Sequence, residues 1–594
     1  MANRGGNPSV TIAGGGVAGL TAAHRLLERG YDVTLIEANS FIGGKLAAHQ
    51  DRDEISNGME APEGATTSSV RSCAACEDQG GCLCRGDWHE HCYHMYLNWY
   101  HNFWQLMGEI GTLDGFVPMP AVYNMHRAAR EPAIPVVNVG SPWTALPNLF
   151  AGLGTPADMF LWGQTMADLV GQPAHRDGWL EKTSITAFMK SQPYTTDQAL
   201  AGTYRTTAQA FASPSYLSSA RSYKALLSYG LRLPEPSMWL LTANTEDAIF
   251  TPWLKCLAQL AKSFEVEQHE YFEPPGAFQA AVEARDGKCG PGGRLTIKML
   301  TQLQALGIDD ETGRVTHATL GRCHSSPSVH RGRTRITPLP EPMKIDGDLI
   351  LALPLAQLSS LVTPRIARRA PNLADLCYLR CEPMISIDLY FRKKLEGLPN
   401  GITVLLDSPY EMSFFDNSQN WKSMEAGNTV LNVVASNADT LTPSVNSNRH
   451  IIDTLLDELG RYIDFERADL FDCRTHLQTN LGEELFVNQV GSWQWRPTAT
   501  CGIPNLYIAG DYCQTFVDVV TIEGAAVSGL IAAEALRRRH GQGYPMQILQ
   551  PDQYPVLAMS AAAMAQRPFA YLARAFSAAD DAIKSQYRQW FPNG

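Results

Sequence analysis

Five cysteines and three histidines fall within 22 residues, at positions 73–94. Four of the cysteines follow the spacing C-x2-C-x5-C-x-C: Cys73, Cys76, Cys82 and Cys84. Two cysteines separated by two residues can bind one metal ion, and four thiolates form the tetrahedral shell of a structural zinc site. An iron–sulfur cluster also needs four thiolates, but this spacing matches neither common ferredoxin pattern. A loop of free thiols is the third interpretation, and the sequence leaves all three open.

A second group of residues indicates a nucleotide site near the N-terminus. Gly14, Gly16 and Gly19 have the spacing G-x-G-x-x-G, directly after the apolar segment 10–13. The first glycine permits a tight turn, the second lets a pyrophosphate approach the backbone, and the third lets a helix pack close to the strand. Glu37 ends the next apolar segment and is placed to accept hydrogen bonds from a ribose. The pattern therefore predicts a strand, a helix and a second strand that bind a dinucleotide.

A third segment, nearly five hundred residues later, has the same kind of pattern. "NLYIAGD" predicts a strand that ends at Gly510 and Asp511. "IEGAAVSGLIAAEAL" then predicts a helix with Glu523 and Gly524 in its first turn. Because a helix N-terminus offers free N–H groups and partial positive charge, it suits an electron-rich ligand.

Together these two ends resemble the FAD-dependent phytoene desaturase and amine oxidase superfamily, and most closely its carotenoid desaturase and hydroxysqualene dehydroxylase branch. The segment "EHCYHMYLNWYHNFWQLMGEIG" (90–111) is similar to that branch in its histidine and Tyr-x-Asn, here His94, Tyr100 and Asn102. Residues 140–153, 348–362 and 383–391 are further counterparts, in the same order. The resemblance covers most of residues 9–539.

The resemblance implies FAD as the cofactor and assigns roles to several residues. "FIGGK" would line the phosphates with Gly43 and Gly44, and Lys45 is either a phosphate partner or a solvated lysine. Asp511 would hold a ribityl or phosphate-side hydroxyl, and the helix at Glu523 would stabilise the reduced flavin. His94 is the one candidate for a catalytic acid or base, with a hydrogen-bonded core histidine as the alternative. The candidate substrate pocket is aromatic, although core packing is the default for each side chain: Tyr96, Tyr100, Trp493 and Trp495.

The expected fold class is α/β, with a discontinuous Rossmann-type FAD-binding domain and an α+β substrate domain, as in amine oxidases. We expect the FAD-binding domain to consist of residues 8–110, 270–360 and 485–540. The substrate domain would take residues 111–270 and 361–484. A chain of 594 residues is too long for a single hydrophobic core, which agrees with such a division.

Two segments depart from the family pattern. A cysteine-rich insertion occupies about 53–86, and a C-terminal helical extension occupies 541–594. His91, Cys92 and His94 follow the insertion; we assign them to the body of the fold and do not count them among metal ligands. The extension carries aromatic residues at helical spacing, which predicts packing onto the body or peripheral contact with a membrane.

Composition restricts the partners. The net charge of −12 and the lack of a long Lys/Arg run argue against nucleic acid. No apolar run approaches the roughly 20 residues that a transmembrane helix needs. An odd number of cysteines, 13, without a secretory leader favours the cytoplasm. We leave the oligomeric state open.

Three functions are compatible with these observations. The first is an FAD-dependent oxidoreductase that dehydrogenates, dehydroxylates or isomerises a large apolar substrate of the isoprenoid class. The second is oxidation of an amine or amino acid, which needs an aromatic cage to which Trp493 or Trp495 could contribute. The third is a lipid-binding protein without catalysis, like the Rab GDP-dissociation inhibitors, although those proteins lack a complete flavin site.

Overall fold

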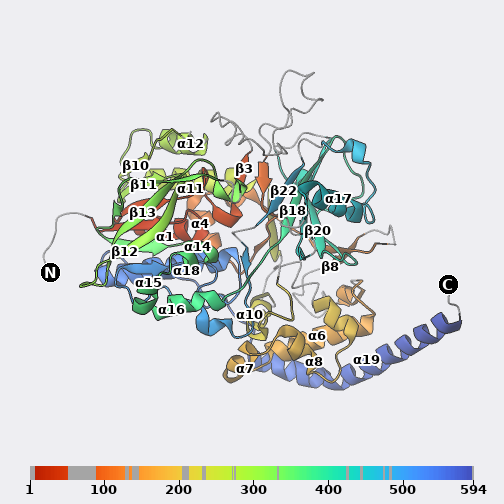
Figure 1. Ribbon diagram of the computed structural model, residues 1–594. Coiled ribbons are helices and arrows are strands. Elements are labelled where there is room, and N and C mark those ends of the chain that lie inside the picture. Colours follow the sequence, from red (N-terminus) through yellow and green to blue (C-terminus); the bar gives the residue numbers. More distant parts are fainter. Residues whose placement is uncertain are drawn as a thin grey trace.

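The computed structural model describes residues 7–50 and 88–590, apart from gaps at 128–132, 137–145, 151, 204–212, 231–235, 271, 273–275, 331–333, 423–426, 440, 442–445, 472–474 and 481–483. Two sheets lie side by side, with a group of helices below them in the view of Figure 1. In the described part of the chain, no helix combines the length and apolar character needed to cross a bilayer. Cys73, Cys76, Cys82 and Cys84 lie outside the described residues, so the metal prediction made for them stays a prediction.

The first sheet has six parallel strands drawn from distant parts of the sequence. Their spatial order is β10 (Ser263–Val266), β11 (Arg294–Lys298), β2 (Asp32–Ile36), β1 (Ser9–Ala13), β16 (Asp348–Leu351) and β24 (Leu506–Ile508). Parallel sheets are covered on both faces, which explains why β16 is buried throughout and apolar from its second residue, Leu349, onward. The predicted α/β class with a Rossmann-type domain is confirmed.

Alternate residues of these strands face two different cores. Ile12 and Leu35 pack with the helices α1 (Val17–Leu27), α11 (Thr251–Leu260) and α18 (Ile522–His540). Ala13 and Ile36 face the other core, shared with the antiparallel pair β12 (Thr301–Ile308) and β13 (Val315–Cys323) and the helix α14 (Leu355–Ser360). This alternation is the two-residue period of a strand.

Helices α1 and α18 join the two ends of the chain. They touch so closely that a Cβ on Gly529 would lie 2.2 Å from the carbonyl oxygen of Ala18. A small residue is therefore required at that position of α18. The contact holds the middle of α18 against the start of α1.

The second sheet is seven-stranded and mainly antiparallel. Its order is β22 (His476–Thr479), β18 (Ile385–Phe391), β21 (Thr429–Ala435), β20 (Met412–Asp416), β19 (Thr403–Leu405), β7 (Val122–Met125) and β8 (Ile134–Val136). Helix α17 (Asn448–Leu459) shares a core with this sheet. Strands β18 and β21 are buried along their whole length, so this sheet is also covered on both faces.

The remaining helices form the lower group: α6 (Pro156–Val170), α7 (Asp177–Glu181), α8 (Ile185–Lys190) and α10 (Ala220–Gly230). A long helix, α19 (Val556–Trp590), packs against α6 and then extends past it (Figure 1). The paired strands β3 (Ala48–Gln50) and β4 (Trp88–Glu90) flank residues 51–87. The predicted domain boundaries stay predictions. Strand β10, which belongs to the first sheet, begins at residue 263, seven residues before the expected start of the second piece at 270.

Candidate functional site

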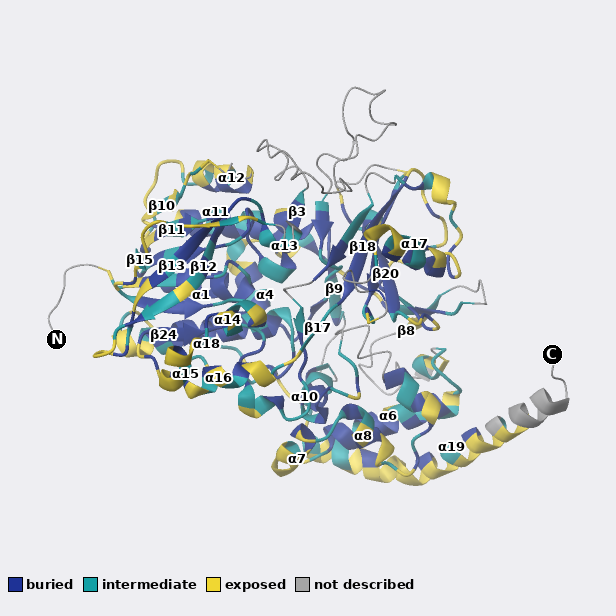
Figure 2. Ribbon diagram, viewed as in Figure 1, coloured by how far each residue is buried: buried dark blue, intermediate teal, exposed yellow. Residues whose placement is uncertain are grey.

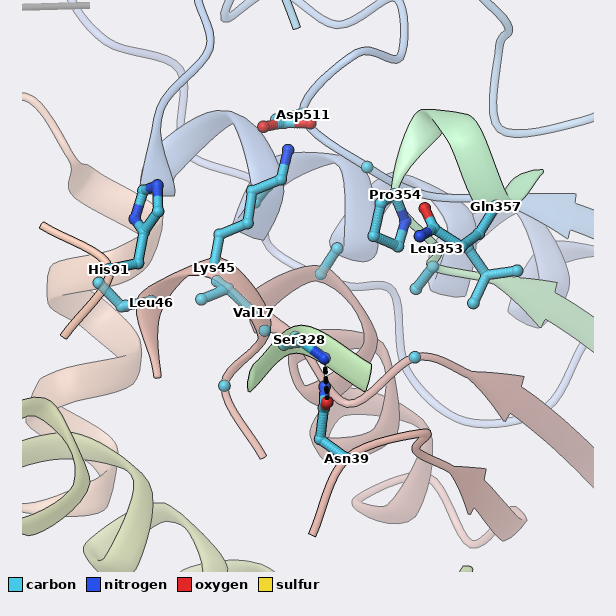
Figure 3. A pocket seen from close by; sticks show the side chains of 18 of the residues that line it. Val17, Asn39, Lys45, Leu46, His91, Ser328, Leu353, Pro354, Gln357 and Asp511 are labelled. Atoms are coloured by element: carbon cyan, nitrogen blue, oxygen red, sulfur yellow. Dashed lines mark hydrogen bonds between the residues drawn. The ribbon is translucent and has the colours of Figure 1, made fainter. Parts of the chain in front are cut away.

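A cavity of about 540 Å³ opens where the parallel strands end. Its lining comes from the ends of β1, β2, β16 and β24, from the starts of α1 and α18, and from the loop after β4 (Figure 3). Ligands of open α/β sheets bind at the carboxyl ends of the strands. The cavity therefore lies where the fold itself predicts a binding site.

The glycine loop at the end of β1 has the geometry that its spacing predicts. Gly14 has φ +106°, and a Cβ there would lie 2.2 Å from the carbonyl oxygen of Ala352. A Cβ on Gly19 would lie 1.9 Å from the oxygen of Gly14. By contrast, a Cβ on Gly16 would find no atom nearer than 3.7 Å, because Gly16 faces the cavity.

Gly16 is also the N-cap of α1 and has no side chain to cap the helix. The first N–H groups of a helix carry partial positive charge and favour an anion. The cavity wall includes Val17 and Ala18, the first residues of α1. This end of the helix is suited to a pyrophosphate.

Glu37 lies at the end of β2, is only 6% exposed, and lines the cavity. Its Oε2 accepts a hydrogen bond of 2.7 Å from the Gly15 N–H, and its Oε1 accepts bonds of 2.9 Å from the backbone and the amide group of Asn39. The Oδ1 of Asn39 in turn accepts from the Ser328 N–H at 3.0 Å (Figure 3). These bonds fix the carboxylate where a ribose would meet it.

The segment after β2 packs directly on the glycine loop. The Gly43 N–H donates to the Gly15 oxygen at 2.8 Å, and Gly43 and Gly44 both have positive φ angles, +116° and +59°. Lys45 lines the cavity, and its Nζ donates to the Glu484 carbonyl at 3.1 Å. In Figure 3 its side chain extends toward Asp511. A role of Lys45 in binding a phosphate stays a proposal.

The C-terminal half of the site is built by β24 and α18. Gly510 has φ +155°, its N–H donates to Ser528 Oγ at 2.8 Å, and Asp511 follows it on the cavity wall. The start of α18 also lines the cavity, through Thr521, Ile522 and Ala525. The two predicted halves thus meet at one cavity.

Two residues predicted to face the cofactor have other roles in the structure. Glu523 is fully buried, and its carboxylate accepts hydrogen bonds of 2.6–3.0 Å from the Asn102 N–H and amide and from the Phe103 N–H, in the first turn of α4 (His101–Ile110). The Gly524 N–H donates to the N-cap side chain of Thr521 at 3.0 Å. Successive residues of a helix point about 100° apart, so Ile522 and Ala525 face the cavity while Glu523 faces α4. Neither Glu523 nor Gly524 is among the residues that line the cavity, so their predicted role in binding the cofactor stays a prediction.

Burial raises the pKa of Glu523 to about 7, although its three hydrogen bonds favour the charged form. A carboxylate placed there ties α18 to α4 rather than to a ligand. The prediction had assigned a binding role to a residue that holds two helices together.

The four aromatic residues predicted to form the substrate pocket do not line this cavity. Tyr96 is fully buried and stacks on Phe103, with ring centroids 5.3 Å apart, and Tyr100 is 4% exposed in the same core. The guanidinium carbon of Arg221 lies 3.8 Å from the ring centroid of Trp493, and Trp495 packs on Tyr378. Core packing accounts for the first pair and surface packing for the second.

His94 lines the cavity, together with its neighbours His91, Cys92 and Tyr93. Its Nδ1 lies 3.7 Å from Glu90 Oε2, and its Nε2 lies 3.8 Å from Cys92 Sγ. Burial opposes the charged form, but the neighbouring Cys92 and Glu90 outweigh it and raise the pKa of His94 to about 10. Burial likewise opposes ionisation of Cys92, but the two histidines lower its thiol pKa to about 6.

Sequence reasoning missed one wall of the cavity. Met384, Val434 and Ser436 come from the second sheet or directly beside it, and Leu485 comes from β23 (Leu485–Phe486). Ala352, Leu353 and Pro354 follow β16. The "ALP" that follows a buried strand could have been predicted to line the cavity, because a parallel strand ends at the same edge of the sheet as β1. No comparable pattern in the sequence marks the side chains of the second sheet.

These residues fit FAD. The site offers a helix N-terminus without a capping side chain, an acid fixed at the end of β2, and glycines that leave the backbone exposed at Gly16. The cavity then continues from these groups to the loop of His91 and His94. A dinucleotide with a further ring system needs such an elongated site.

Comparison with known proteins gives the same assignment. Residues 12–71 match the model of the NAD(P)-binding Rossmann-like domain, and residues 331–537 match that of the flavin containing amine oxidoreductases. These matches support the resemblance to the superfamily of FAD-dependent amine oxidases and desaturases. Members of this superfamily bind FAD, and the two matched segments contain both halves of the cavity described above.

Individual relatives match this chain over short segments. L-amino-acid oxidase from Siganus canaliculatus is 51% identical over 45 residues, 8% of each chain. 15-cis-phytoene desaturase from Arabidopsis thaliana is 31% identical over 105 residues, 18% of this chain and 13% of the relative. The solved structure of cyclohexylamine oxidase from Brevibacterium oxydans covers 90% of this chain and 100% of its own, with a TM-score of 0.51 and 13% identity. The last likeness shows the fold alone, and the matched segments span about a tenth of the curated relatives.

Proposed function

We propose that this protein is an FAD-dependent oxidoreductase that dehydrogenates a large apolar substrate of the isoprenoid class. Dehydroxylation and isomerisation are variants of the same chemistry on such a substrate. One observation carries the proposal: a single cavity joins the nucleotide-binding groups of the first sheet to an apolar wall next to the second sheet. Bound FAD would supply the hydride acceptor.

The apolar wall supports this substrate class. Met384 and Val434 form a buried cluster against which Cys92, Tyr93 and Leu485 pack. All five residues also line the cavity. A wall of this kind binds hydrocarbon through burial of apolar surface, worth roughly 25 cal/mol per Å².

The polar residues would bind the cofactor and exclude water. Glu37 would accept hydrogen bonds from a ribose, Asp511 from a hydroxyl further along the cofactor, and the start of α18 would lie beside the electron-rich end of the ring. His94 lines the cavity beside these groups and is the proposed acid or base there.

Oxidation of an amine or amino acid is the second candidate, favoured by the matched flavin containing amine oxidoreductase model and by the segment shared with an L-amino-acid oxidase. This reaction needs an aromatic cage for the amine. Trp493 and Trp495 lie outside the cavity, and Tyr93 and Tyr512 are the aromatic side chains with six-membered rings that line it within the described residues. The geometry therefore favours the apolar substrate.

An anaerobic visible spectrum of the FAD-loaded protein tests the choice. We expect a panel of polyenes and prenyl alcohols to bleach the flavin absorption and a panel of amines to leave it unchanged. Bleaching by amines alone would replace the proposal with amine oxidation. Absence of flavin, even after FAD is supplied, would favour the lipid-binding alternative without catalysis.

We further propose that α19 makes peripheral contact with a membrane that holds the substrate. Ala563, Ala570 and Ser577, each seven residues apart, are buried on this helix. The opposite side exposes large apolar side chains, as Figure 2 shows along the helix: Phe569 (62%), Leu572 (58%), Phe576 (71%) and Ile583 (66%). A cytoplasmic location of the protein stays a prediction.

Sedimentation with phospholipid vesicles tests this contact. The double variant Phe569→Ser/Phe576→Ser should lose most of the vesicle binding, because each buried aromatic side chain contributes about 1.5–3 kcal/mol. Ala565→Ser on the same helix is the matched control. Equal binding by both variants would contradict the proposal.

A further inference from the structure

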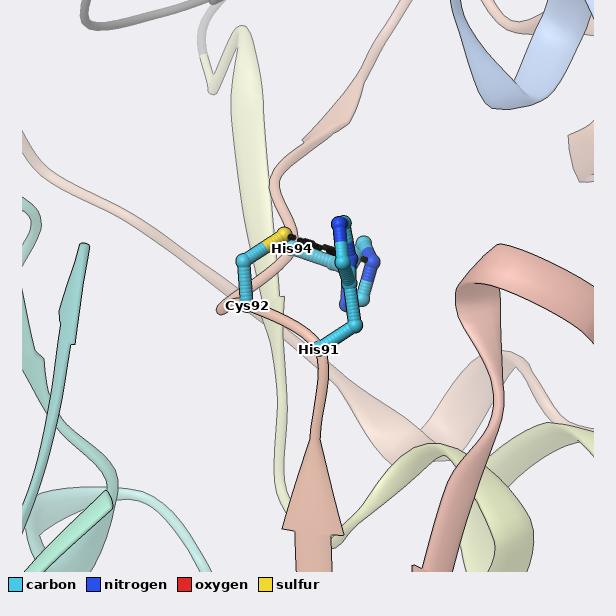
Figure 4. A group of neighbouring side chains, drawn as sticks. All are labelled: His91, Cys92 and His94. Atoms are coloured by element: carbon cyan, nitrogen blue, oxygen red, sulfur yellow. Dashed lines mark hydrogen bonds between the residues drawn. The ribbon is translucent and has the colours of Figure 1, made fainter. Parts of the chain in front are cut away.

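Three side chains that can bind a metal converge at the cavity wall, in the loop after β4 (Figure 4). Cys92 Sγ lies 3.3 Å from His91 Nδ1 and 3.8 Å from His94 Nε2. All three ligand atoms lie within 4.8 Å of one another. We propose that His91, Cys92 and His94 bind a zinc ion, in a site distinct from the four cysteines of the insertion.

The distances agree with zinc coordination. Bonds of about 2.3 Å to sulfur and about 2.05 Å to nitrogen at tetrahedral angles separate the sulfur and nitrogen atoms by about 3.6 Å. The two observed separations, 3.3 and 3.8 Å, lie on either side of this value. The third separation, between the two histidine nitrogens, is below 4.8 Å, so all three ligand atoms lie around one position for an ion.

The backbone of the loop is fixed on both sides of the cluster. Ser386 Oγ donates to the His91 carbonyl at 2.5 Å, and the Tyr93 N–H donates to Asn432 Oδ1 at 3.0 Å. Tyr93 itself hydrogen-bonds to Ser413 Oγ at 2.5 Å. The second sheet thus holds residues 91 to 94 in the curve that brings the ligands together.

The outer groups also suit a metal site. Glu90 accepts the Thr245 N–H at 2.8 Å through Oε1, which leaves Oε2 at 3.7 Å from His94 Nδ1. A carboxylate behind a ligating histidine is the usual arrangement at metal centres, where it orients the ring and increases its basicity. His94 would therefore bind the ion through Nε2, the nitrogen that faces Cys92.

Three protein ligands leave one of four positions open, as in catalytic zinc sites. Because His91, Cys92 and His94 all line the main cavity, this position is accessible to a water molecule or a substrate oxygen. The proposal departs from the expectation from sequence, which did not count these three residues as ligands. The inference does not depend on FAD, since none of the three ligand atoms contributes to the nucleotide end of the cavity.

Cobalt(II) substitution tests the site in the full-length protein. After chelation of bound metal, titrated Co²⁺ in a tetrahedral thiolate site gives d–d absorption at wavelengths longer than those of flavin. We expect one Co²⁺ per chain in the wild type. The variant with serine at the four insertion positions, Cys73→Ser/Cys76→Ser/Cys82→Ser/Cys84→Ser, should keep this spectrum.

The Cys92→Ser variant should lose the thiolate spectrum and bind Co²⁺ at least about a hundredfold more weakly, a larger loss than removal of an outer partner gives. Glu90→Gln should weaken binding about tenfold. Cys377→Ser, at an exposed cysteine, is the matched control and should bind like the wild type. His91→Gln is a second ligand variant, should Cys92→Ser fail to fold.

FAD content and circular dichroism, measured on the same samples, separate loss of the metal site from loss of the flavin site or of the fold. A thiolate spectrum that survives Cys92→Ser would overturn the proposal. So would its disappearance in the folded four-serine variant, which would place the metal in the insertion. A folded wild type that binds neither Co²⁺ nor Zn²⁺ would likewise overturn it.

Discussion

The two ends of the cavity differ in what forms their walls: backbone atoms at one end and side chains at the other. At the nucleotide end, the wall is mostly backbone: Gly14 and Gly16 after β1, Gly43 beside them, and Gly510 after β24. At the other end it is made of side chains that come from the loop after β4 and from the second sheet, such as Cys92, Met384 and Val434. A backbone wall serves one cofactor, whereas a side-chain wall can change with the substrate while the fold stays the same.

We expect the largest effect on FAD binding from a substitution at the backbone end of the cavity. In Gly16→Val, the new side chain would occupy the space meant for the pyrophosphate, while φ at this position, −76°, suits any residue. We expect FAD affinity to fall at least about a hundredfold, a loss of ~3 kcal/mol, with little change in Tm. Fluorescence titration with FAD measures this. Gly163→Ala, at an exposed glycine in α6 without near neighbours, should leave affinity unchanged.

The side-chain end predicts the opposite result. Leu485→Glu places a charge in the apolar wall and should slow flavin reduction by an apolar substrate about tenfold or more, since a charge near hydrocarbon is costly. FAD affinity should change less than about threefold. Stopped-flow absorbance gives the rate, and Leu485→Met is the matched control. Faster reduction by amines in Leu485→Glu would support the second candidate function.

Two buried glutamates, Glu37 and Glu523, should differ in their effect on FAD affinity. Glu37 faces the cavity, and Glu37→Gln keeps its size but loses the charge that accepts three N–H groups. We expect FAD affinity to fall about tenfold, because hydrogen bonds to a charged group are worth about 1.5–3 kcal/mol. Calorimetric titration measures the change. An unchanged affinity would mean that Glu37 only supports the glycine loop.

Glu523 should give the smallest effect on FAD and a distinct effect on stability. Its pKa is raised from the ordinary 4.5 to about 7 in the fold, so the folded state keeps a proton that the unfolded state loses above about pH 4.5. The stability from this proton is present below about pH 4.5 and is lost as the pH rises to about 7, up to the order of 3 kcal/mol. Denaturation between pH 4.5 and 8 should show a weaker decline in Glu523→Gln than in the wild type. An identical decline in both would contradict the assignment.

The sequence could predict what a backbone requires. The spacing of Gly14, Gly16 and Gly19 and the acid at Glu37 are needed by the turn, the helix and the ribose together, and the structure places them as expected. Glu523 shows the limit, because a difference of one position around a helix decides between the cavity and α4. No pattern in the sequence could place Trp493 outside the cavity, since its position depends on how the chain folds around Arg221.

His91, Cys92 and His94 show a different limit. Their types and spacing were visible, but the resemblance to a family led us to treat them as part of the common body of the fold. What the sequence lacked was the anchoring of this loop by Ser386 and Asn432, which lie about three hundred residues later. Convergence of side chains on a loop depends on such distant contacts.

The flavin content of the purified full-length protein tests the central claim most directly. After FAD is supplied and excess is removed by gel filtration, the absorption spectrum should show about one FAD per chain in the wild type and almost none in Gly16→Val. A wild type that retains no flavin, or a Gly16→Val variant that retains as much as the wild type, would contradict the assignment of this cavity to FAD.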